Sequence, residues 1–577
     1  MDIEITENAA ARMRDGTVLR SDVYRPRGAG PLPVLVCRTP YGKRGEALGS
    51  NYAATATGLA GRGYVVVVQD TRGRYASEGV YRWLNGPGAD EDHTLDGYDT
   101  IEWAANLPGS SGQVGTWGNS YDGYTSLRAA GAAPPSLSAV FASGVAERMH
   151  DETFGIFKPI YLEWTQSMAT DMRARAANPA VPAARPATTA ARPAVLGGDS
   201  AGPVSWLDDM IWTLPYDAIG DDTFAGLTEP FKRSLREQEI DFWALHKTEP
   251  AISAPVCHLT GWWDYVCRGT VAHFTGLRER GAANLRGQHR LVIGPWSHRT
   301  GRSAAGDGAI DYGPAEHVFY HDEIAGWYDY ALKGEDPGGY GRGQVKIFIL
   351  NDNQWCWLDT WPADQATATR FYLHSNGSAN TPHGDGRLSR DEPPAGTKPS
   401  QYVYDPRDPV ISLSDWSSRA IDQSTRDQRQ DVLVYESEPL ERSLLVIGDA
   451  SCTLWVSTDG PETDFTAKLI EVRPDGLSVE LAWGIIRTRY LDGYDSVVRL
   501  EPGTPYELTI GLGPVGVRFE PGSRIRLDIS SSDFPNFDRN HNTGADYWSD
   551  AELRPARQTV FSDRQRPAWL TLPVCPE

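Results

Sequence analysis

The chain has 577 residues, of which 55 are basic and 76 acidic, for a formal net charge of −21. This length exceeds what one hydrophobic core usually supports and predicts about two to four domains, while 40% apolar residues and 19 tryptophans exclude an intrinsically disordered chain. The acidic balance argues against nucleic acid or an anionic membrane as the main partner, because both attract positive charge.

The sequence predicts a protein of the cytoplasm. No apolar window of about 18 residues is present, so no membrane-spanning helix is expected. The first residues, MDIEITENAA, carry acidic side chains and no apolar run, so no secretory signal is expected. The six cysteines are scattered and form no CxxC pair, which predicts neither a disulfide framework nor a zinc site.

Residues 1–145 alternate between strand and helix patterns. Short runs rich in β-branched residues end in turn residues, as in PVLVCRTPYG and YVVVVQDTRG, and such runs fit strands buried on both faces of a sheet. The predicted strands are 33–42, 64–73, 113–120 and 137–144, and the predicted helices are 92–107 and 124–133. This alternation implies parallel βαβ units with functional loops at the carboxyl ends of the strands.

The alternation is interrupted by a predicted insertion at 146–247. Its middle segment, 178–198, holds four prolines, which exclude a regular helix. The elements predicted after residue 145 are helices at 151–177, 231–247 and 316–334 and strands at 254–264 and 289–298. We therefore expect a helical insertion within an α/β domain that resumes at residue 248.

From about residue 365 the pattern changes to short alternating segments, such as TLWVSTD, TAKLIEV and RIRLDISSS, separated by Pro and Gly turns. Hardly any helix pattern occurs in this part of the chain. Such a succession of short strands predicts an all-β sandwich or jelly roll.

Ser120 lies between an apolar strand and a helix, in the segment TWGNSYDG. A nucleophilic serine at such a sharp turn needs glycines close by, because the backbone is strained and the flanking chain is crowded. Gly118 and Gly123 meet this need, although Asp122 stands where the usual second glycine would be. The motif alone is frequent by chance, so its interpretation depends on its surroundings.

Asp264 and His298 each follow a predicted strand, so both are expected on the same rim of the sheet as Ser120. A serine nucleophile needs a base, and the base needs an orienting acid, in the chain order Ser, Asp, His for such a fold. A single Asp after a strand is more often a cap or turn residue, and a single His is more often a surface or packing residue. Three candidates in this order, each at a strand end, predict a catalytic triad.

The sequence resembles the cocaine esterase and X-prolyl dipeptidyl-peptidase family of α/β-hydrolases over nearly its whole length. The resemblance is carried by the ordered motifs MRDGTVLRSDVYRP, RTPYGK, VVVVQDTRGRYASEG, GNSYDG, GWWD, GPWSH, TDFTAKLIEVRPDG and SSDFPNFDRNHNTG. It is stronger to the bacterial-type, cocaine-esterase-like enzymes than to the peptidases. It implies an α/β-hydrolase domain at 1–145 and 248–364, a helical cap at 146–247 and a C-terminal jelly-roll domain at 365–577.

The resemblance also implies a role for each candidate residue. Ser120 would attack the acyl carbonyl, His298 would shuttle the proton, and Asp264 would hold the imidazole. The oxyanion hole would consist of the backbone N–H of Tyr121 and the hydroxyl of Tyr41, a fixed donor that needs no reorganisation. Without the resemblance, Tyr41 reads as a buried aromatic side chain whose hydroxyl satisfies a loop carbonyl.

The predicted cap carries Phe154, Phe157, Tyr161 and Trp164, whose spacing predicts one face of a helix. Such a stripe is more often core packing than a ligand wall. By the resemblance, Trp164 lies where the cap presents an aromatic side chain to the acyl group, which makes it the candidate substrate-binding residue. The loop at 414–416 is expected to approach the same cleft.

Specificity is expected to differ from that of the family's α-amino-ester hydrolases, which place carboxylates soon after the triad aspartate to bind a substrate ammonium. Here no acidic residue stands between Asp264 and Arg268, so an ammonium-bearing acyl group is disfavoured. Arg268 has two interpretations. It attracts an acidic acyl chain, or it is a helix-start arginine or a partner in a structural ion pair, which is the commoner role.

No metal and no cofactor is expected. The acidic run at 90–93 lacks the spacing and the glycine of a calcium loop and precedes a predicted helix. His317 and His321 lie four residues apart, but no Glu follows the first in the manner of a zinc peptidase. No glycine-rich phosphate loop follows a strand.

The sequence thus predicts a serine hydrolase that cleaves carboxylic esters of small molecules through an acyl-enzyme, and a homodimer is compatible with it. An amidase, an acylase or an X-prolyl dipeptidyl-peptidase would use the same triad, and sequence alone does not separate these activities. An inactive scaffold that binds carbohydrate or a partner through its β domain is the non-enzymatic alternative.

Overall fold

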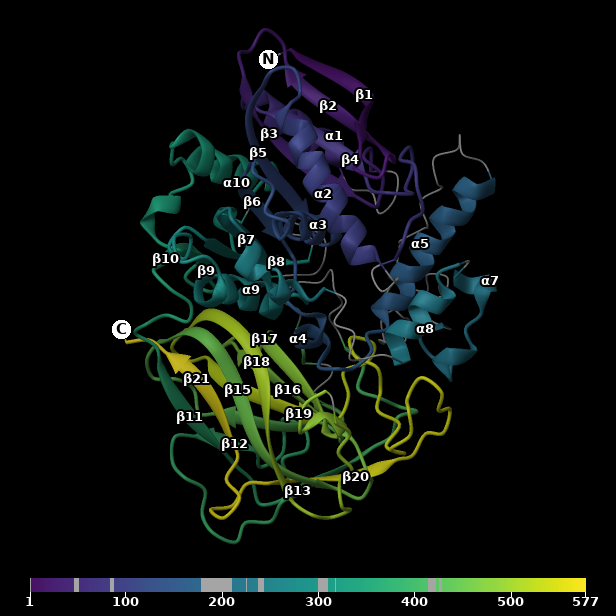
Figure 1. Ribbon diagram of the computed structural model, residues 1–577. Helices are drawn as coiled ribbons and strands as arrows, with labels where there is room; N and C mark the ends of the chain where they lie inside the picture. Colours follow the sequence, from purple (N-terminus) through teal and green to yellow (C-terminus); the bar gives the residue numbers. More distant parts are fainter. Residues whose placement is uncertain are drawn as a thin grey trace.

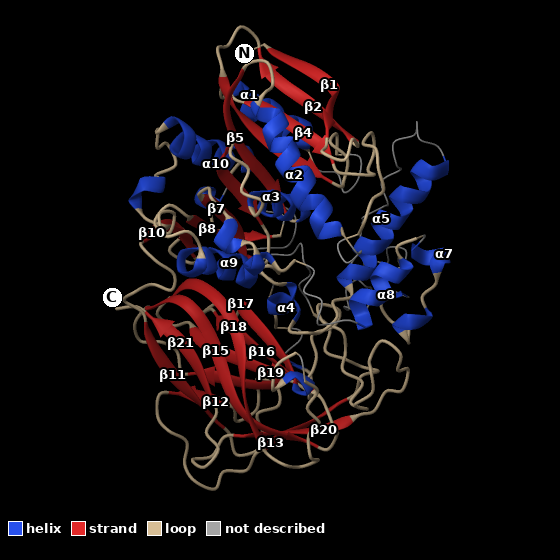
Figure 2. Cartoon of the chain, viewed as in Figure 1, coloured by secondary structure: helices blue, strands red, loops and turns tan. Residues whose placement is uncertain are grey.

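The computed structural model describes residues 2–45, 51–83, 88–177, 210–224, 226–236, 243–298, 310–316, 318–412, 422–424, 428–494 and 496–576. Figure 1 shows two large β layers, one built from the first two thirds of the chain and one from the last third. Helices surround the first layer, whereas the second is almost entirely strand and loop (Figure 2).

The first sheet has ten strands in the order β1-β2-β4-β3-β5-β6-β7-β8-β9-β10. Its strands are β1 (Ile3–Arg12), β2 (Val18–Pro26), β3 (Leu32–Thr39), β4 (Val65–Asp70), β5 (Ser110–Asn119), β6 (Leu137–Ser143), β7 (Val256–Trp263), β8 (Arg290–Ser297), β9 (Val345–Ile349) and β10 (Gln354–Leu358). The strands from β4 to β9 are parallel, and the outer pairs are antiparallel. The loops that follow β5, β7 and β8 therefore emerge at one edge of the sheet.

Helices cover both faces of this sheet because its central strands are apolar on both sides. The described helices are α1 (Tyr52–Gly61), α2 (Ala89–Ala105), α3 (Tyr121–Ala130), α4 (Met149–Thr153), α5 (Ile160–Ala177), α7 (Asp221–Phe224), α8 (Thr228–Arg236), α9 (Cys267–Arg280) and α10 (Tyr320–Tyr328). Val66 and Val68 of β4 pack in one core with α1 and α10, and Val65 and Val67 pack in another with α2 and α3. Alternate residues of one strand thus serve the two helical layers.

The inserted segment contributes α5, α7 and α8, which lie to one side of the sheet in Figure 1. The prediction that Phe154, Phe157, Tyr161 and Trp164 share one helix face is wrong. Phe154 ends α4 with a φ of 52°, Gly155 follows with a φ of 68°, and α5 starts only at Ile160, after a proline. The left-handed turn and the proline break the helix, so only Tyr161 and Trp164 lie on α5.

Other predictions for the insertion are met only in part. Of the helix predicted at 231–247, residues 231–236 belong to α8, residues 237–242 lie outside the described residues, and residues 245–247 form a single 3₁₀ turn. The Pro-rich segment at 178–198 and His317 lie outside the described residues.

The second sheet contains β11 (Thr367–His374), β12 (Arg387–Ser389), β13 (Ser400–Tyr404), β14 (Leu433–Ser437), β15 (Leu444–Thr458), β16 (Asp464–Val472), β17 (Ser478–Arg487), β18 (Tyr506–Phe519), β19 (Arg524–Ser530), β20 (Ala556–Phe561) and β21 (Trp569–Val574). Its pairs are antiparallel except β12 with β14. One apolar core joins it to the first sheet, because Trp262, Phe274 and Phe348 cluster with Ile510 and Val517.

The predicted fold class is confirmed: an α/β-hydrolase domain with helices inserted into it is followed by a domain rich in β strands, and both sheets are mixed. The boundaries at 145, 247 and 364 stay predictions. Among the described helices, none has both the length and the apolar character needed to cross a bilayer.

Three buried histidines lie against one another between β7, α9 and the start of β8. His258 Nε2 and His273 Nδ1 share a hydrogen bond of 2.8 Å, and His289 Nδ1 accepts the N–H of Val256 at 3.2 Å. Burial lowers the pKa of His258 to about 3 and that of His289 to about 4, and it holds the pKa of His273 well below its usual value. The cluster is therefore neutral in the folded chain at neutral pH.

This cluster makes the fold sensitive to acid. Below pH ~6.5 the unfolded chain protonates these histidines while the folded chain does not, so the free energy of unfolding should fall as pH drops toward about 4. The double variant His258→Gln/His273→Gln should show a shallower slope of unfolding free energy against pH in urea titrations. A slope equal to that of the unmodified chain would contradict this assignment.

Candidate active site

Ser120 occupies the turn between β5 and α3. Its φ of 58° and ψ of −122° are strained for a side chain with a Cβ, and its N–H donates to the carbonyl of Ser143 at 2.9 Å. α3 begins at the next residue, so the serine projects from the tip of a tight strand-to-helix turn. This is the geometry of a nucleophile elbow.

The flanking glycines are required by crowding. A Cβ on Gly118 would lie 2.3 Å from the carbonyl carbon of Asp122, and a Cβ on Gly123 would lie 2.4 Å from Cγ2 of Val145. Real Cβ atoms do not approach other heavy atoms so closely. The glycines found in the sequence are therefore those that the turn needs, and Asp122 occupies a position where a side chain fits.

Asp264 and His298 follow β7 and β8 at the same edge of the sheet. His298 Nδ1 lies 2.8 Å from Asp264 Oδ1, and the two residues are 7% and 1% exposed. Asp264 also accepts the N–H of Val266 at 3.1 Å and the hydroxyl of Thr260 at 3.2 Å. A carboxylate held in this way fixes the orientation of the imidazole.

Gly144, at the end of β6, shows how closely these loops meet. A Cβ at this position would lie 3.1 Å from His298 Cε1, 3.2 Å from Asp264 Oδ2 and 3.0 Å from Oδ1 of Asn119, the residue before Ser120. The structure thus brings His298, Asp264 and the residue before Ser120 together around Gly144, at the ends of β5 to β8.

Tyr41 lies in the loop after β3 and is 5% exposed. Trp164 Nε1 on α5 donates a hydrogen bond of 3.1 Å to its hydroxyl oxygen. Burial raises the pKa of Tyr41 well above its usual value, so the hydroxyl keeps its proton. Because the oxygen accepts from Trp164, the phenolic proton remains available for another acceptor.

Tyr121 stacks edge-on against Tyr41 and Trp164, with ring centroids 6.1 and 6.2 Å away. Its hydroxyl shares a 2.8 Å hydrogen bond with His93 Nε2. The side chain is thereby fixed, and with it the first turn of α3 that carries the Tyr121 N–H. The predicted residues Tyr41, Tyr121 and Trp164 form one contiguous aromatic group.

A buried hydrogen-bond chain links the serine turn to the Tyr41 loop. The Tyr52 hydroxyl donates to Asp122 Oδ2 at 2.6 Å and contacts the Thr39 hydroxyl at 2.8 Å, and Thr39 Oγ1 accepts the N–H of Tyr41 at 3.1 Å. Burial raises the pKa of Asp122 to about 7. A role for Asp122 or Tyr52 could not be predicted from the sequence, because these hydrogen bonds join residues that are distant in sequence.

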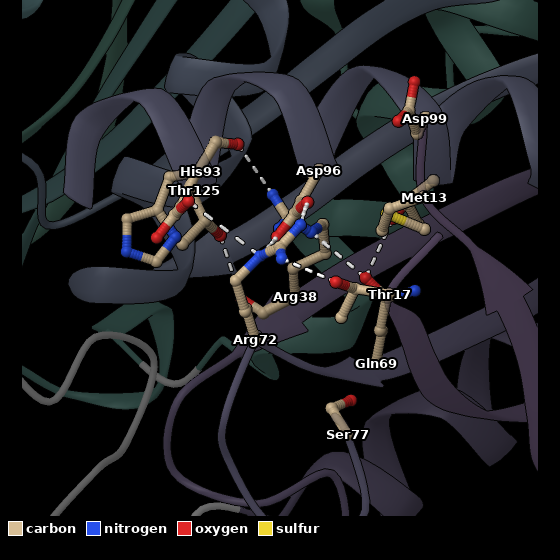
Figure 3. Close-up of polar contacts among 12 residues, drawn as sticks. Met13, Thr17, Arg38, Gln69, Arg72, Ser77, His93, Asp96, Asp99 and Thr125 are labelled. Atoms are coloured by element: carbon tan, nitrogen blue, oxygen red, sulfur yellow. Dashed lines mark hydrogen bonds and ion pairs between the residues drawn. The ribbon is translucent and has the colours of Figure 1, made fainter. Parts of the chain in front are cut away.

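A second buried network holds the strand that leads to Tyr41 (Figure 3). Arg38 donates to the carbonyl of His93 at 2.9 Å and to Gln69 Oε1 at 3.2 Å. Arg72 binds Asp96 through two hydrogen bonds of 2.6 and 2.9 Å. These contacts fasten the ends of β3 and β4 to α2, the helix that also carries His93.

The loop after Asp264 is attached to the β-rich domain. Trp263 Nε1 donates to the carbonyl of Glu480 at 2.9 Å, and Arg268 donates to the carbonyls of Gly511 (2.7 Å), Trp483 and Leu512. This favours the structural interpretation of Arg268, although its partners are carbonyls and not a carboxylate. The loop at 414–416, predicted to approach the cleft, lies outside the described residues.

Tyr265 is a residue of this region that sequence analysis did not single out. Its ring lies 4.6 Å from that of His298, centroid to centroid. Its position next to Asp264 in the chain was the only signal available in the sequence.

Comparison with known proteins agrees with this architecture. The model of the family described as X-Pro dipeptidyl-peptidase (S15 family) matches residues 15–300, and that of the X-Pro dipeptidyl-peptidase C-terminal non-catalytic domain matches residues 340–571. Cocaine esterase from Rhodococcus sp. (strain MB1 Bresler) is 30% identical over 600 residues, which span 99% of this chain and 98% of that protein.

Two solved structures are similar over the full chain. An aminopeptidase from the marine sediment archaeon Thaumarchaeota archaeon has a TM-score of 0.82 at 25% identity, covering 100% of this chain and 97% of that one. An α-amino acid ester hydrolase has a TM-score of 0.79 at 25% identity, covering 99% of this chain and 97% of that one.

The Trp164–Tyr41 hydrogen bond predicts a measurable effect. Trp164→Phe removes the donor and leaves the Tyr41 hydroxyl free to rotate, so kcat for an aryl ester should fall about 3- to 10-fold, the worth of one neutral hydrogen bond. Trp83→Phe is the matched control, because Trp83 packs 4.5 Å from Trp164 and has no hydrogen bond to Tyr41. Equal losses in the two variants would count against a role for the hydrogen bond.

Proposed function

We propose that this chain, which belongs to the X-Pro dipeptidyl-peptidase (S15) family that includes cocaine esterase, cleaves its substrates through the triad Ser120, Asp264 and His298. Its membership and its likeness to cocaine esterase along the whole chain make it an enzyme that hydrolyses ester bonds. What we propose is which residues carry out this hydrolysis. The observation that carries it is the 2.8 Å contact of His298 with Asp264 beside the strained turn of Ser120.

The proposed reaction begins when Ser120 Oγ attacks the ester carbonyl and His298 Nε2 accepts its proton. Asp264 stabilises the imidazolium that forms, because its carboxylate is bound to Nδ1. The tetrahedral oxyanion accepts from the Tyr121 N–H and the Tyr41 O–H. Both donors are held before substrate arrives, so little reorganisation is needed.

The intermediate then collapses. The bond from the carbonyl carbon to the leaving oxygen breaks, and the alcohol leaves with the proton from His298, which gives an acyl-enzyme on Ser120. Water repeats the sequence with His298 as base, and it releases the acid and restores Ser120. The whole cycle needs only the groups of this chain, the ester and one water molecule.

X-Pro dipeptidyl-peptidase activity is the second candidate, favoured by the family description and by the similar aminopeptidase. A peptidase of this kind must hold a free amino terminus. Glu152 lines a cleft beside Asp264, but its carboxylate accepts the N–H of Gly269, and Lys158 and Arg268 line the same cleft. The two carboxylates of this cleft are thus bonded to Gly269 and His298 and stand beside two cations, so no free acidic group is offered to an ammonium, and ester hydrolysis is the function the geometry supports best.

The remaining predictions concern the substrate class, the cellular location, the oligomeric state and the partners of the enzyme. A small-molecule ester or amide fits an enzyme of this family as substrate. The cytoplasmic location, the bacterial type of the enzyme, the homodimer and the lack of nucleic-acid or membrane partners stay predictions.

Ser120→Ala tests the nucleophile. Ester turnover should fall to background and labelling by a fluorophosphonate probe should disappear, because the variant lacks the attacking oxygen. The midpoint of thermal unfolding should change little, since Ser120 is partly exposed. Retained labelling would remove Ser120 as nucleophile, and an unmodified chain that does not label would refute the triad.

Tyr41→Phe tests the oxyanion hole. The acylation rate constant should fall about 10²–10³-fold, the usual cost of losing one such donor, while KM changes little. Tyr64→Phe serves as a control, because it removes another buried tyrosine hydroxyl, which donates to Asp329 and takes no part in the contacts that hold Tyr41. An unchanged rate in Tyr41→Phe would return Tyr41 to a packing role.

A further inference from the structure

A cleft at the boundary of the two domains adjoins the proposed triad. It lies between the α4–α5 connection, the start of α9 and the strands β17 and β18, and Asp264 and Tyr265 form part of its wall. It contains about 340 Å³ of space that protein atoms do not fill, its open mouth included.

Lys158 provides a cation on the wall of this cleft. The residue is 4% exposed, and its ammonium lies over the rings of Tyr265 (5.1 Å) and Phe537 (4.7 Å). Within the described ranges no hydrogen bond or ion pair of this ammonium is present, and only the backbone carbonyl of Lys158 is bonded, by the N–H of Tyr161 at 2.9 Å. A buried ammonium usually pairs with a carboxylate, because its N–H donors lose the water that they had in the unfolded chain.

The nearby carboxylates are each engaged by another group. Asp264 accepts from His298, Asp533 pairs with Lys468 at 3.0 Å, and Glu152 accepts the N–H of Gly269. The donors of Lys158 are thus available to an acceptor that enters the cleft.

Two further features make the cleft favourable for an anion. The guanidinium of Arg268 lines it, with its N–H groups directed at the carbonyls of β17 and β18, so it contributes positive charge without being the donor. The first turn of α9 also lies at this wall and carries no acidic residue, so the positive end of the helix dipole acts there. Both features add positive potential at the cleft, but the hydrogen-bond donor for an anion remains Lys158.

The cleft is close to the reacting groups. Tyr265 contacts both Lys158 and His298: the ammonium lies 5.1 Å from the centroid of its ring, and its ring and that of His298 are 4.6 Å apart, centroid to centroid. One side chain, Tyr265, therefore links the ammonium to the proposed base.

We propose that Lys158 binds a carboxylate of the substrate, so that the preferred substrates are esters that carry a carboxylate a few bonds from the scissile carbonyl. The inference rests on the proposed function, since it assigns specificity to the same site. The carboxylate belongs either to the acid part or to the alcohol part of the ester, and the chemistry that Lys158 recognises is the same in both.

The test compares matched esters. In one arm, aryl monoesters of succinate, glutarate and adipate are compared with aryl butyrate, valerate and hexanoate, in which a methyl group replaces the carboxylate. In the other arm, 4-carboxyphenyl butyrate is compared with phenyl butyrate. The unmodified enzyme should favour the carboxylate member of at least one pair in kcat/KM, and the arm that shows the preference identifies the part of the ester that Lys158 binds.

Variants then attribute the preference to Lys158. Lys158→Met should lower kcat/KM for the favoured carboxylate ester about 30-fold or more, as for loss of one partner of a buried charge pair, and leave the neutral ester nearly unchanged. Lys158→Arg should restore a large part of the preference. Lys247→Met is the charge-matched control, because Lys247 is exposed and outside the cleft.

The outcomes separate this inference from the triad. If neutral esters are cleaved with no carboxylate preference in either arm, or if Lys158→Met keeps the preference, the carboxylate site is refuted and the triad stands. If the unmodified enzyme neither cleaves esters nor labels with a fluorophosphonate, the triad itself fails. Turnover of the neutral ester by Lys158→Met also shows that this variant is folded.

The preference should also depend on pH. Burial lowers the pKa of Lys158 to about 8, while Glu152, Asp533, Asp264 and Arg268 face the same ammonium. The charged form exists below this pH, so the carboxylate preference should weaken above it as the ammonium loses its proton. In Lys158→Arg it should persist at about pH 9, because the guanidinium stays charged. Equal pH profiles of the preference in both proteins would contradict the assignment to Lys158.

Discussion

The strained backbone of Ser120 is the constraint on which the rest of the site depends. A left-handed φ at a residue with a Cβ costs about 1–3 kcal/mol and persists only where the surroundings enforce it. Here β5 pairs with β6 up to Asn119, α3 starts at Tyr121, and Gly118 and Gly123 allow the two segments to approach. Once that turn is fixed, the Tyr121 N–H, the Asp122 carboxyl and the serine hydroxyl have their positions as well.

The remaining groups are held to this turn by buried polar contacts and not by apolar packing alone. The Asp122–Tyr52–Thr39 chain reaches the backbone of Tyr41, and the Arg38–Arg72–Asp96 network fastens the neighbouring strand ends to α2. Charge-assisted hydrogen bonds of this kind are directional, so they specify one arrangement more strictly than hydrophobic contact does. The two halves of the proposed oxyanion hole come from different loops, and these contacts set their distance.

The sequence predicted the parallel sheet and the strand ends that carry Ser120, Asp264 and His298, because buried strands and their turn residues form a local pattern. The resemblance added Tyr41, Tyr121 and Trp164, which periodicity does not reveal. The helix stripe failed at Phe154 and Phe157, because the left-handed turn at Gly155 outweighed a favourable spacing. Lys158 and Tyr52 were missed, since their partners lie far away in the sequence and only the folded chain brings them together.

The attachment of Trp263 and Arg268 to β17 and β18 has a consequence for how the enzyme would fail. Both residues flank Asp264, and their acceptors are carbonyls of the C-terminal domain. If heat or denaturant separates the two domains, the acid loop loses its support while the parallel sheet and the serine turn remain intact. Inactivation would then precede unfolding of the hydrolase sheet, and the domain that the family description terms non-catalytic would set the temperature at which catalysis stops.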